Sequence, residues 1–152
     1  MAATERAAEA SARVPESHAD LVECPPVAAL TTVTADGYPH TSVVWCDFDG
    51  IHVRVNTMRG FRKERNMRGN PRVTLLCFDP RRPLRYLEVR GRVVKMTEER
   101  AMEHLDCLAS KYAGRPVRYF GDVIPSRFRE SEVPVLCLIL PTHVVVRDWS
   151  RA

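Results

Sequence analysis

The sequence predicts a mainly β protein, a small antiparallel barrel of six to seven strands with helical decorations. Apolar and β-branched runs recur along the 152 residues, and turn signals rich in Gly, Pro and Asp separate them. Short turns between the early runs favour antiparallel neighbours over the helical crossovers of a parallel sheet. One segment, after Thr97, has the apolar spacing of a substantial amphipathic helix.

The composition is that of one ordinary domain. A hydrophobic content of 45% and a charged content of 28% suit a globular chain of this length, and the net charge of +4 is mild. Residues 1–17 are rich in Ala and Glu and are expected to form a mobile tail, with the folded domain over 18–152. Five scattered cysteines indicate free thiols in a reducing compartment. Without a leader or a membrane-length apolar run, we expect a cytoplasmic protein with no membrane partner.

The first part of the chain predicts a short helix and a three-stranded meander. The helix is expected over Ser17–Cys24, with Ser17 as its cap and two prolines after it. The strands are expected at Val27–Thr34, Tyr38–Cys46 and Ile51–Val55. Glycine-containing turns between them predict that each strand pairs with the next.

A basic segment then interrupts the strands. A short helix is predicted over Phe61–Arg68, because Gly69 and Pro71 form a typical helix stop. The turn and helix carry five positive charges, on Arg59, Arg62, Lys63, Arg65 and Arg68. A helix N-terminus has unpaired N–H groups and a partial positive charge, so with basic side chains it attracts anions. The segment predicts a phosphate-binding corner. The alternatives are a solvated basic face, or a Lys63 that pairs with Glu64 or Glu88.

The second part of the chain predicts strands around one long helix. Two strands are expected at Arg72–Phe78 and Leu84–Met96. A helix capped by Thr97 follows and is expected to bury Ala101, Leu105, Leu108 and Tyr112. After a loop over 114–132, the last two strands are expected at Val133–Leu140 and Thr142–Val146. Gly91 predicts a bulge in the long strand, and Pro141 separates the last two strands. A loop as long as 114–132 is typical of a functional lid.

Motifs for catalysis by side chains are absent from the sequence. There is no nucleophile elbow, Walker loop or dinucleotide glycine motif, and the five histidines are dispersed, so neither a catalytic residue nor a metal site is predicted. A protein without acid and base residues can still work when a bound cofactor supplies the chemistry. The basic corner suits such a scheme.

Two motifs resemble a known family. The segments Thr57-x-x-Gly-x-x-Lys63-x-x-Asn66-Met and Pro83-x-x-Tyr86-x-Glu88-Val-x-Gly91 are similar to those of the FMN-binding split-barrel superfamily named after pyridoxamine 5′-phosphate oxidase. Within it, the chain is most similar to members assigned to the deazaflavin cofactor F420. The resemblance implies a split β-barrel and a homodimer with two cofactor sites at the subunit interface.

The resemblance also implies which residues bind the cofactor. Lys63 is the expected main partner of the cofactor phosphate, assisted by Arg62 and Arg59. Asn56 and Thr57, at the end of a strand, would offer backbone or hydroxyl donors. The residues implied around the ring are Val44, Trp45 and Cys46 from the second strand, and Leu84, Arg85, Tyr86 and Leu87 from the long strand of this subunit or its partner.

The resulting functional expectation is an F420-dependent oxidoreductase that transfers a hydride between the deazaflavin and an unsaturated small organic substrate. An FMN-binding flavoprotein oxidoreductase is one alternative, and a non-catalytic module that binds a polyanion or cofactor is another. Phe61 is the one aromatic residue in the basic run, so no nucleic-acid partner is expected. The chain ends soon after Val146, which leaves little room for the family's C-terminal substrate-phosphate site, so vitamin B6 oxidation is not expected.

Overall fold

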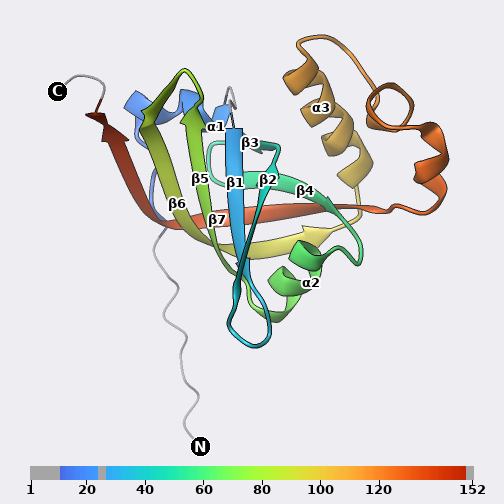
Figure 1. Cartoon of the computed structure of the whole chain (residues 1–152), viewed down its shortest axis with the longest axis horizontal. Helices are drawn as coiled ribbons and strands as arrows, with labels where there is room; N and C mark the ends of the chain where they lie inside the picture. The colour runs from blue at the N-terminus through green and yellow to red at the C-terminus, as the bar shows by residue number, and fades with distance from the viewer. Residues whose placement is uncertain (1–10, 24–26, 150–152) are drawn as a thin grey trace, which may run out of the picture.

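The computed structural model describes residues 11–23 and 27–149, which fold around a single antiparallel sheet. The sheet has seven strands in the order β2-β1-β5-β6-β7-β4-β3, and it curls into a split barrel (Figure 1). The strands are β1 (Val27–Val33), β2 (Pro39–Val44), β3 (Cys46–Phe48), β4 (Val53–Met58), β5 (Arg72–Asp79), β6 (Arg82–Thr97) and β7 (Pro134–Asp148). The predicted mainly β, antiparallel split barrel is therefore confirmed.

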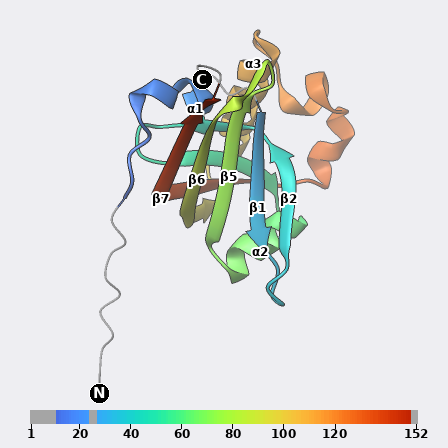
Figure 2. The ribbon, with the colours of Figure 1, turned by 60° about the vertical axis from the view of Figure 1, so that its left-hand side comes forward.

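The helical elements lie around this sheet. They are the 3₁₀ turn η1 (Glu16–His18), α1 (Asp20–Glu23), α2 (Arg62–Gly69), α3 (Ala101–Ala113), the irregular turn η2 (Tyr119–Val123) and the 3₁₀ turn η3 (Ser126–Glu130). In the turned view, five strands from β7 to β2 lie side by side, with α1 near one end of the sheet and α2 near the other (Figure 2).

The predicted helix over Ser17–Cys24 is divided between η1 and α1, and Cys24 lies outside the described residues. Ser17 does not cap it, since its hydroxyl contacts His18 Nδ1 at 2.9 Å. Ala12, in the segment predicted as a tail, donates its backbone N–H to the Pro141 carbonyl at 2.8 Å.

The predicted meander is wrong after its first hairpin. β1 and β2 pair as expected, but the strand predicted over Tyr38–Cys46 ends at Val44, and Trp45 separates it from β3. β3 pairs with β4, and β4 pairs with β7 rather than with β2. β2 and β3 are the two edges of the sheet, yet Trp45 alone joins them in the chain. The two edges must therefore meet at Trp45, and this contact brings the barrel toward closure.

The last two predicted strands form one continuous strand, β7, which passes through Pro141. Pro141 lies opposite Gly91 at a shift in the β6–β7 register, and a bulge is a position where a strand tolerates proline. A Cβ on Gly91 would lie 2.7 Å from both Ile139 Cγ2 and the Leu140 carbonyl oxygen. The bulge predicted at Gly91 is confirmed, and its cause is the close approach of β7.

The barrel interior holds the main apolar core, and a second, smaller cluster lies outside it. Met58, Leu105 and Phe120 form the centre of the smaller cluster, which joins β4 to α3 and η2. α3 buries Leu105 and Leu108 as predicted, but it begins at Ala101 after Arg100, while Thr97 ends β6. The segment expected as a plain loop over 114–132 contains η2 and η3.

Four cysteines are described, at 46, 77, 107 and 137, and all four are free thiols. Within residues 11–23 and 27–149, no group of three His, Cys, Asp or Glu side chains is placed to hold a metal ion. None of the helices in this part of the chain has the length and hydrophobicity needed to cross a membrane.

Candidate functional site

A pocket of about 230 Å³ opens at the corner where the sheet edges meet. It lies between the start of α2 on one side and α3 with η2 on the other. Its lining residues are Val43, Val44, Trp45, Asn56, Thr57, Met58, Phe61, Lys63, Leu105, Leu108 and Tyr119. The lining contains no carboxylate, and Lys63 is its one charged side chain. The pocket therefore has a basic end at α2 and an apolar end at α3.

Lys63 is a half-buried cation that has no ion pair or hydrogen bond within the described part of the chain. Burial lowers the pKa of its ammonium group, because the charged form loses hydration without gaining an acid partner. The acids that could have neutralised it are occupied. Glu64 accepts the Gly60 N–H at 3.1 Å and pairs with Arg68, while Glu88 pairs with Arg90 at 2.6 Å. The alternative in which Lys63 pairs with either acid is thus wrong.

The N-terminus of α2 adds backbone donors at the same end of the pocket. Phe61 precedes the helix in an extended conformation and provides no capping side chain. The Arg65 N–H donates to the Phe61 carbonyl at 3.0 Å, so the N–H groups of Arg62 and Lys63 have no acceptor within the helix. Unpaired N–H groups beside an unpaired ammonium form a site for an anion.

Two residues that line the pocket each carry a buried polar atom without a partner in the described structure. These atoms are the hydroxyl oxygen of Thr57 and the amide oxygen of Asn56. A buried polar atom without a hydrogen bond costs about 1–3 kcal/mol. On residues that line a pocket, such atoms are candidate partners for a ligand.

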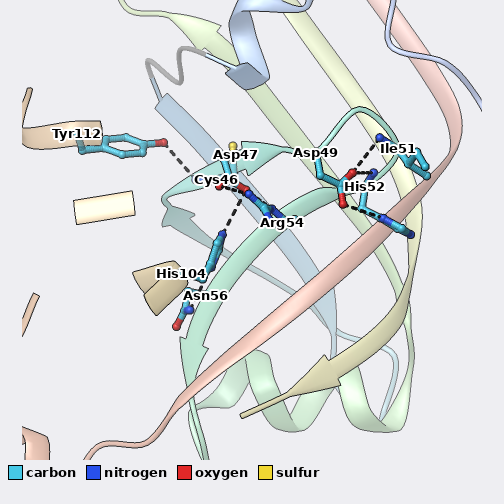
Figure 3. A network of polar contacts seen from close by, with 9 residues as sticks. All are labelled: Cys46, Asp47, Asp49, Ile51, His52, Arg54, Asn56, His104 and Tyr112. Carbon is cyan, nitrogen blue, oxygen red and sulfur yellow. Dashed lines mark hydrogen bonds and ion pairs between the residues drawn. The ribbon is translucent and has the colours of Figure 1, made fainter. Parts of the chain in front are cut away.

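A partly buried network of polar contacts holds the Asn56 side chain (Figure 3). Arg54 donates to both carboxylate oxygens of Asp47 at 2.7 Å, and His104 Nε2 donates to Asp47 Oδ1 at 3.2 Å. Burial alone would raise the pKa of Asp47, but the hydrogen bonds from His104 and Arg54 outweigh it, so the pKa lies below 3.8. Asn56 Nδ2 lies 3.2 Å from His104 Nδ1 and donates to the Ala101 carbonyl at 2.8 Å.

The apolar end of the pocket is built from aromatic and leucine side chains. The Trp45 indole stacks on Tyr112 with ring centroids 5.1 Å apart and meets Tyr119 edge-on at 6.0 Å. The Tyr112 hydroxyl accepts the Cys46 N–H at 3.2 Å, and burial raises the pKa of this phenol, so it stays neutral. With Leu105 from α3, these rings offer an apolar surface for a planar ligand.

Five of the twelve residues implied by the family resemblance meet at this pocket: Val44, Trp45, Asn56, Thr57 and Lys63. The side-chain N–H groups of Asn56 are used by the Ala101 carbonyl and His104, so its amide oxygen is the side-chain group without a partner.

The other implied residues lie elsewhere in this chain. Arg59 donates to Glu98 at 2.6 Å on the surface, and Arg62 is exposed without a described ion pair. Arg85 pairs with Asp20 at 2.7 Å. Leu87, two residues further along β6, is fully buried in the barrel core. Cys46 is also buried in the core. Tyr86 is half-buried on the opposite face of β6, since successive strand residues alternate in direction. None of these side chains lines the pocket of a single chain.

The sequence prediction missed the wall formed by α3 and η2. Leu105 and Leu108 were expected to be buried, but the pattern could not show that they border a ligand pocket as well as a core. Tyr119 comes from the segment expected as a loop. Asp47, between two of the predicted strands, lies in β3, where it is buried and pairs with His104.

This architecture matches known proteins. The family model described as pyridoxamine 5′-phosphate oxidase matches residues 14–131. The chain belongs to the pyridoxamine 5′-phosphate oxidase family. Its fold is thus that of a flavin- or deazaflavin-type oxidoreductase family. No curated protein gives a significant match.

Solved structures agree with this assignment. An F420 reductase is 30% identical, with a TM-score of 0.73, over 87% of this chain and 98% of its own. The conserved hypothetical protein Rv2991 from Mycobacterium tuberculosis is 23% identical with a TM-score of 0.68, over 95% of this chain and 90% of its own. HupZ from Group A Streptococcus is 17% identical with a TM-score of 0.61, over 88% of this chain and 93% of its own. The last two similarities concern the fold alone.

Proposed function

We propose that this protein is an F420-dependent oxidoreductase that transfers a hydride between the deazaflavin and an unsaturated small organic substrate. The observation that carries the proposal is the unpaired Lys63 ammonium at one end of a pocket whose other end is apolar and aromatic. This arrangement suits a molecule with a phosphate on one side and a planar ring on the other. The similarity to an F420 reductase at 30% identity favours the deazaflavin.

The residues present fit such a cofactor. Lys63, the Thr57 hydroxyl and the free N–H groups at the start of α2 would hold the phosphate. Trp45, Leu105 and the aromatic groups beside them would border the ring and exclude water from it. When bound, the deazaflavin supplies the hydride chemistry, and the protein supplies position and a dry surface.

The pocket of one chain would hold only part of the cofactor. Its volume of about 230 Å³ is below the range of roughly 300–1,000 Å³ that is typical of sites for drug-sized ligands. The remainder of the molecule would extend beyond the corner. A second copy of the chain, as the family resemblance implies, would cover that part and could bring Arg85–Leu87 or their neighbours to it. A homodimer with a site at each interface is thus part of the proposal.

Tyr119 is the pocket side chain best suited to meet a substrate. Its phenol lines the pocket, and burial raises its pKa, so it remains a hydrogen-bond donor at neutral pH. It would orient a polar group of the substrate above the ring.

The buried free thiols at 46, 77 and 137 support the expectation of a reducing, cytoplasmic compartment.

FMN is the second candidate cofactor, because the family is defined by an FMN-type oxidase and the same corner would hold its phosphate. The choice between FMN and F420 would not change the role of Lys63. The relative affinities for the two cofactors distinguish the candidates.

Titration of the purified protein with F420 and with FMN tests the proposal. We expect F420 to bind more tightly, and Lys63→Ala to weaken its binding at least tenfold. Arg65→Ala is the matched control, since Arg65 is exposed on the same helix and does not line the pocket. The affinity of this variant for F420 should stay within about twofold of that of the wild type.

Failure of both cofactors to bind would overturn the proposal. Salt-sensitive binding of RNA, equally weakened in both variants, would favour the polyanion-binding alternative instead.

A further inference from the structure

Asn56 is held in a single amide orientation by the buried network shown in Figure 3. The Asp47 carboxylate is paired with Arg54 through both oxygens, so it is ionised and can only accept hydrogen bonds. Its neighbour His104 Nε2 must therefore carry a hydrogen. In a neutral imidazole the other nitrogen, Nδ1, is then an acceptor.

This acceptor determines the orientation of Asn56. The side-chain nitrogen of Asn56 lies 3.2 Å from His104 Nδ1 and 2.8 Å from the Ala101 carbonyl oxygen. Both neighbours accept, and an amide nitrogen carries two hydrogens, so both are used. Rotating the amide by half a turn would place its oxygen against two acceptors and lose both bonds. The amide oxygen of Asn56, a residue that lines the pocket, is left buried and without a partner.

We infer that the Asp47–His104–Asn56 network makes the α3 side of the pocket specific for a ligand ring that presents an N–H or O–H donor. Asn56 Oδ1 is the atom that receives this hydrogen, and Asp47 and His104 are positioning residues that act through it. The inference rests on the proposed function, because the ring in question is that of the bound cofactor. It adds a directional contact at the ring to the phosphate contact at Lys63.

The specificity follows from the cost of an unpaired group. A ring with a donor at this position satisfies the buried Asn56 oxygen, whereas a ring without one leaves it unpaired. Loss of one such hydrogen bond changes affinity by about ten- to a hundredfold. The phosphate contact is unaffected, since Lys63 is on another element, α2.

The experiment compares FMN with its N3-methyl analogue, which keeps the phosphate and lacks the ring imide N–H. We expect the wild type to bind FMN about ten- to a hundredfold more tightly than the analogue, as measured by fluorescence titration. Asn56→Leu, of similar size, should remove most of this preference. Lys63→Ala should weaken both ligands by a similar factor and keep the preference. His104→Ala frees the amide and should reduce the preference without changing the Lys63 contribution.

The outcomes separate the inference from the proposed function. If FMN and F420 both fail to bind the wild type, the proposed function fails. If they bind and need Lys63, but Asn56→Leu keeps the full preference for FMN, the inference alone is overturned.

A measurement on the wild type without ligand covers the case in which a variant does not fold. Nitrogen-15 shifts of neutral His104 should show its hydrogen on Nε2 and none on Nδ1. A hydrogen on Nδ1 would contradict the inference directly.

Discussion

The Trp45 indole stacks on the Tyr112 ring, with centroids 5.1 Å apart and an angle of 23° between their planes. Trp45 connects β2 to β3, and Tyr112 belongs to α3, so this contact fixes the helix against the corner where the sheet edges meet. The Tyr112 hydroxyl also accepts the N–H of Cys46, the residue after Trp45. The apolar end of the pocket is therefore formed before any ligand arrives.

Fluorescence can report on this pocket, because the chain has two tryptophans in different surroundings. Trp45 lines the pocket, whereas Trp149 is 58% exposed near the end of β7. We expect cofactor binding to quench tryptophan emission in the wild type and in Trp149→Phe. In Trp45→Phe most of that change should disappear. Quenching that persists in Trp45→Phe and is lost in Trp149→Phe would place the ligand elsewhere.

Lys63→Met should stabilise the protein in the absence of ligand while it weakens cofactor binding. Burial lowers the pKa of Lys63, so at neutral pH the folded state carries the cost of a poorly hydrated charge. Removing that charge is expected to raise the free energy of unfolding by about 0.5–2 kcal/mol. The gain should be present at pH 7 and fade as the pH rises through the lowered folded pKa toward 10.5, where the unfolded lysine also loses its proton.

Urea unfolding at pH 7 and at pH 10.5 measures this gain. Arg65→Met serves as the control, since Arg65 is exposed on the same helix. A loss of stability in Lys63→Met at pH 7 would show that the lysine has a structural partner.

Asp47→Asn should destabilise the protein in a pH-dependent manner. The pKa of Asp47 is lowered in the folded state, so its stabilising contribution is present above 3.8 and is lost as the pH falls through the folded value. At pH 7 we expect a loss of about 1–3 kcal/mol, because Arg54 and His104 lose an ionised partner. Urea unfolding at pH 7 and pH 2.5 checks this. An equal difference between the two proteins at both values would contradict the assignment.

Gly91→Ala should be strongly destabilising, because the new Cβ would lie 2.7 Å from Ile139 Cγ2 and from the Leu140 carbonyl oxygen. Both atoms belong to β7, whose backbone cannot move away without disturbing the sheet. We expect a loss of about 1–3 kcal/mol or more, seen as a lower melting temperature. Gly69→Ala is the control, since a Cβ added at Gly69 would meet no atom within 4 Å, and it should change stability little.

Local signals in the sequence were sufficient for most of the elements. Pro71 follows the end of α2, although the helix covers Arg62–Gly69 instead of the predicted Phe61–Arg68, and the alternation and turns placed the strands of the β1–β2 hairpin. They were insufficient at Trp45, where one residue carries the chain from one sheet edge to the other. An apolar run that continues through such a corner has the same pattern as one uninterrupted strand. At Pro141 the sequence predicted a break between two strands, but β7 continues through it. The bulge that accommodates Pro141 depends on Gly91 of another strand.

The same distinction applies to the candidate site. The sequence by itself determined a mainly β fold and a basic corner centred on Lys63, because charge, turn residues and strand alternation are properties of neighbouring residues. The tertiary structure decided which of those charges are paired and which is buried, since Arg59 and Arg68 find acids, whereas Lys63 is half-buried without one. It also decided the wall from α3 and the orientation of Asn56, because both depend on contacts between residues about fifty positions apart, such as Asp47 with His104. Such contacts follow from how the barrel closes, which no local pattern records.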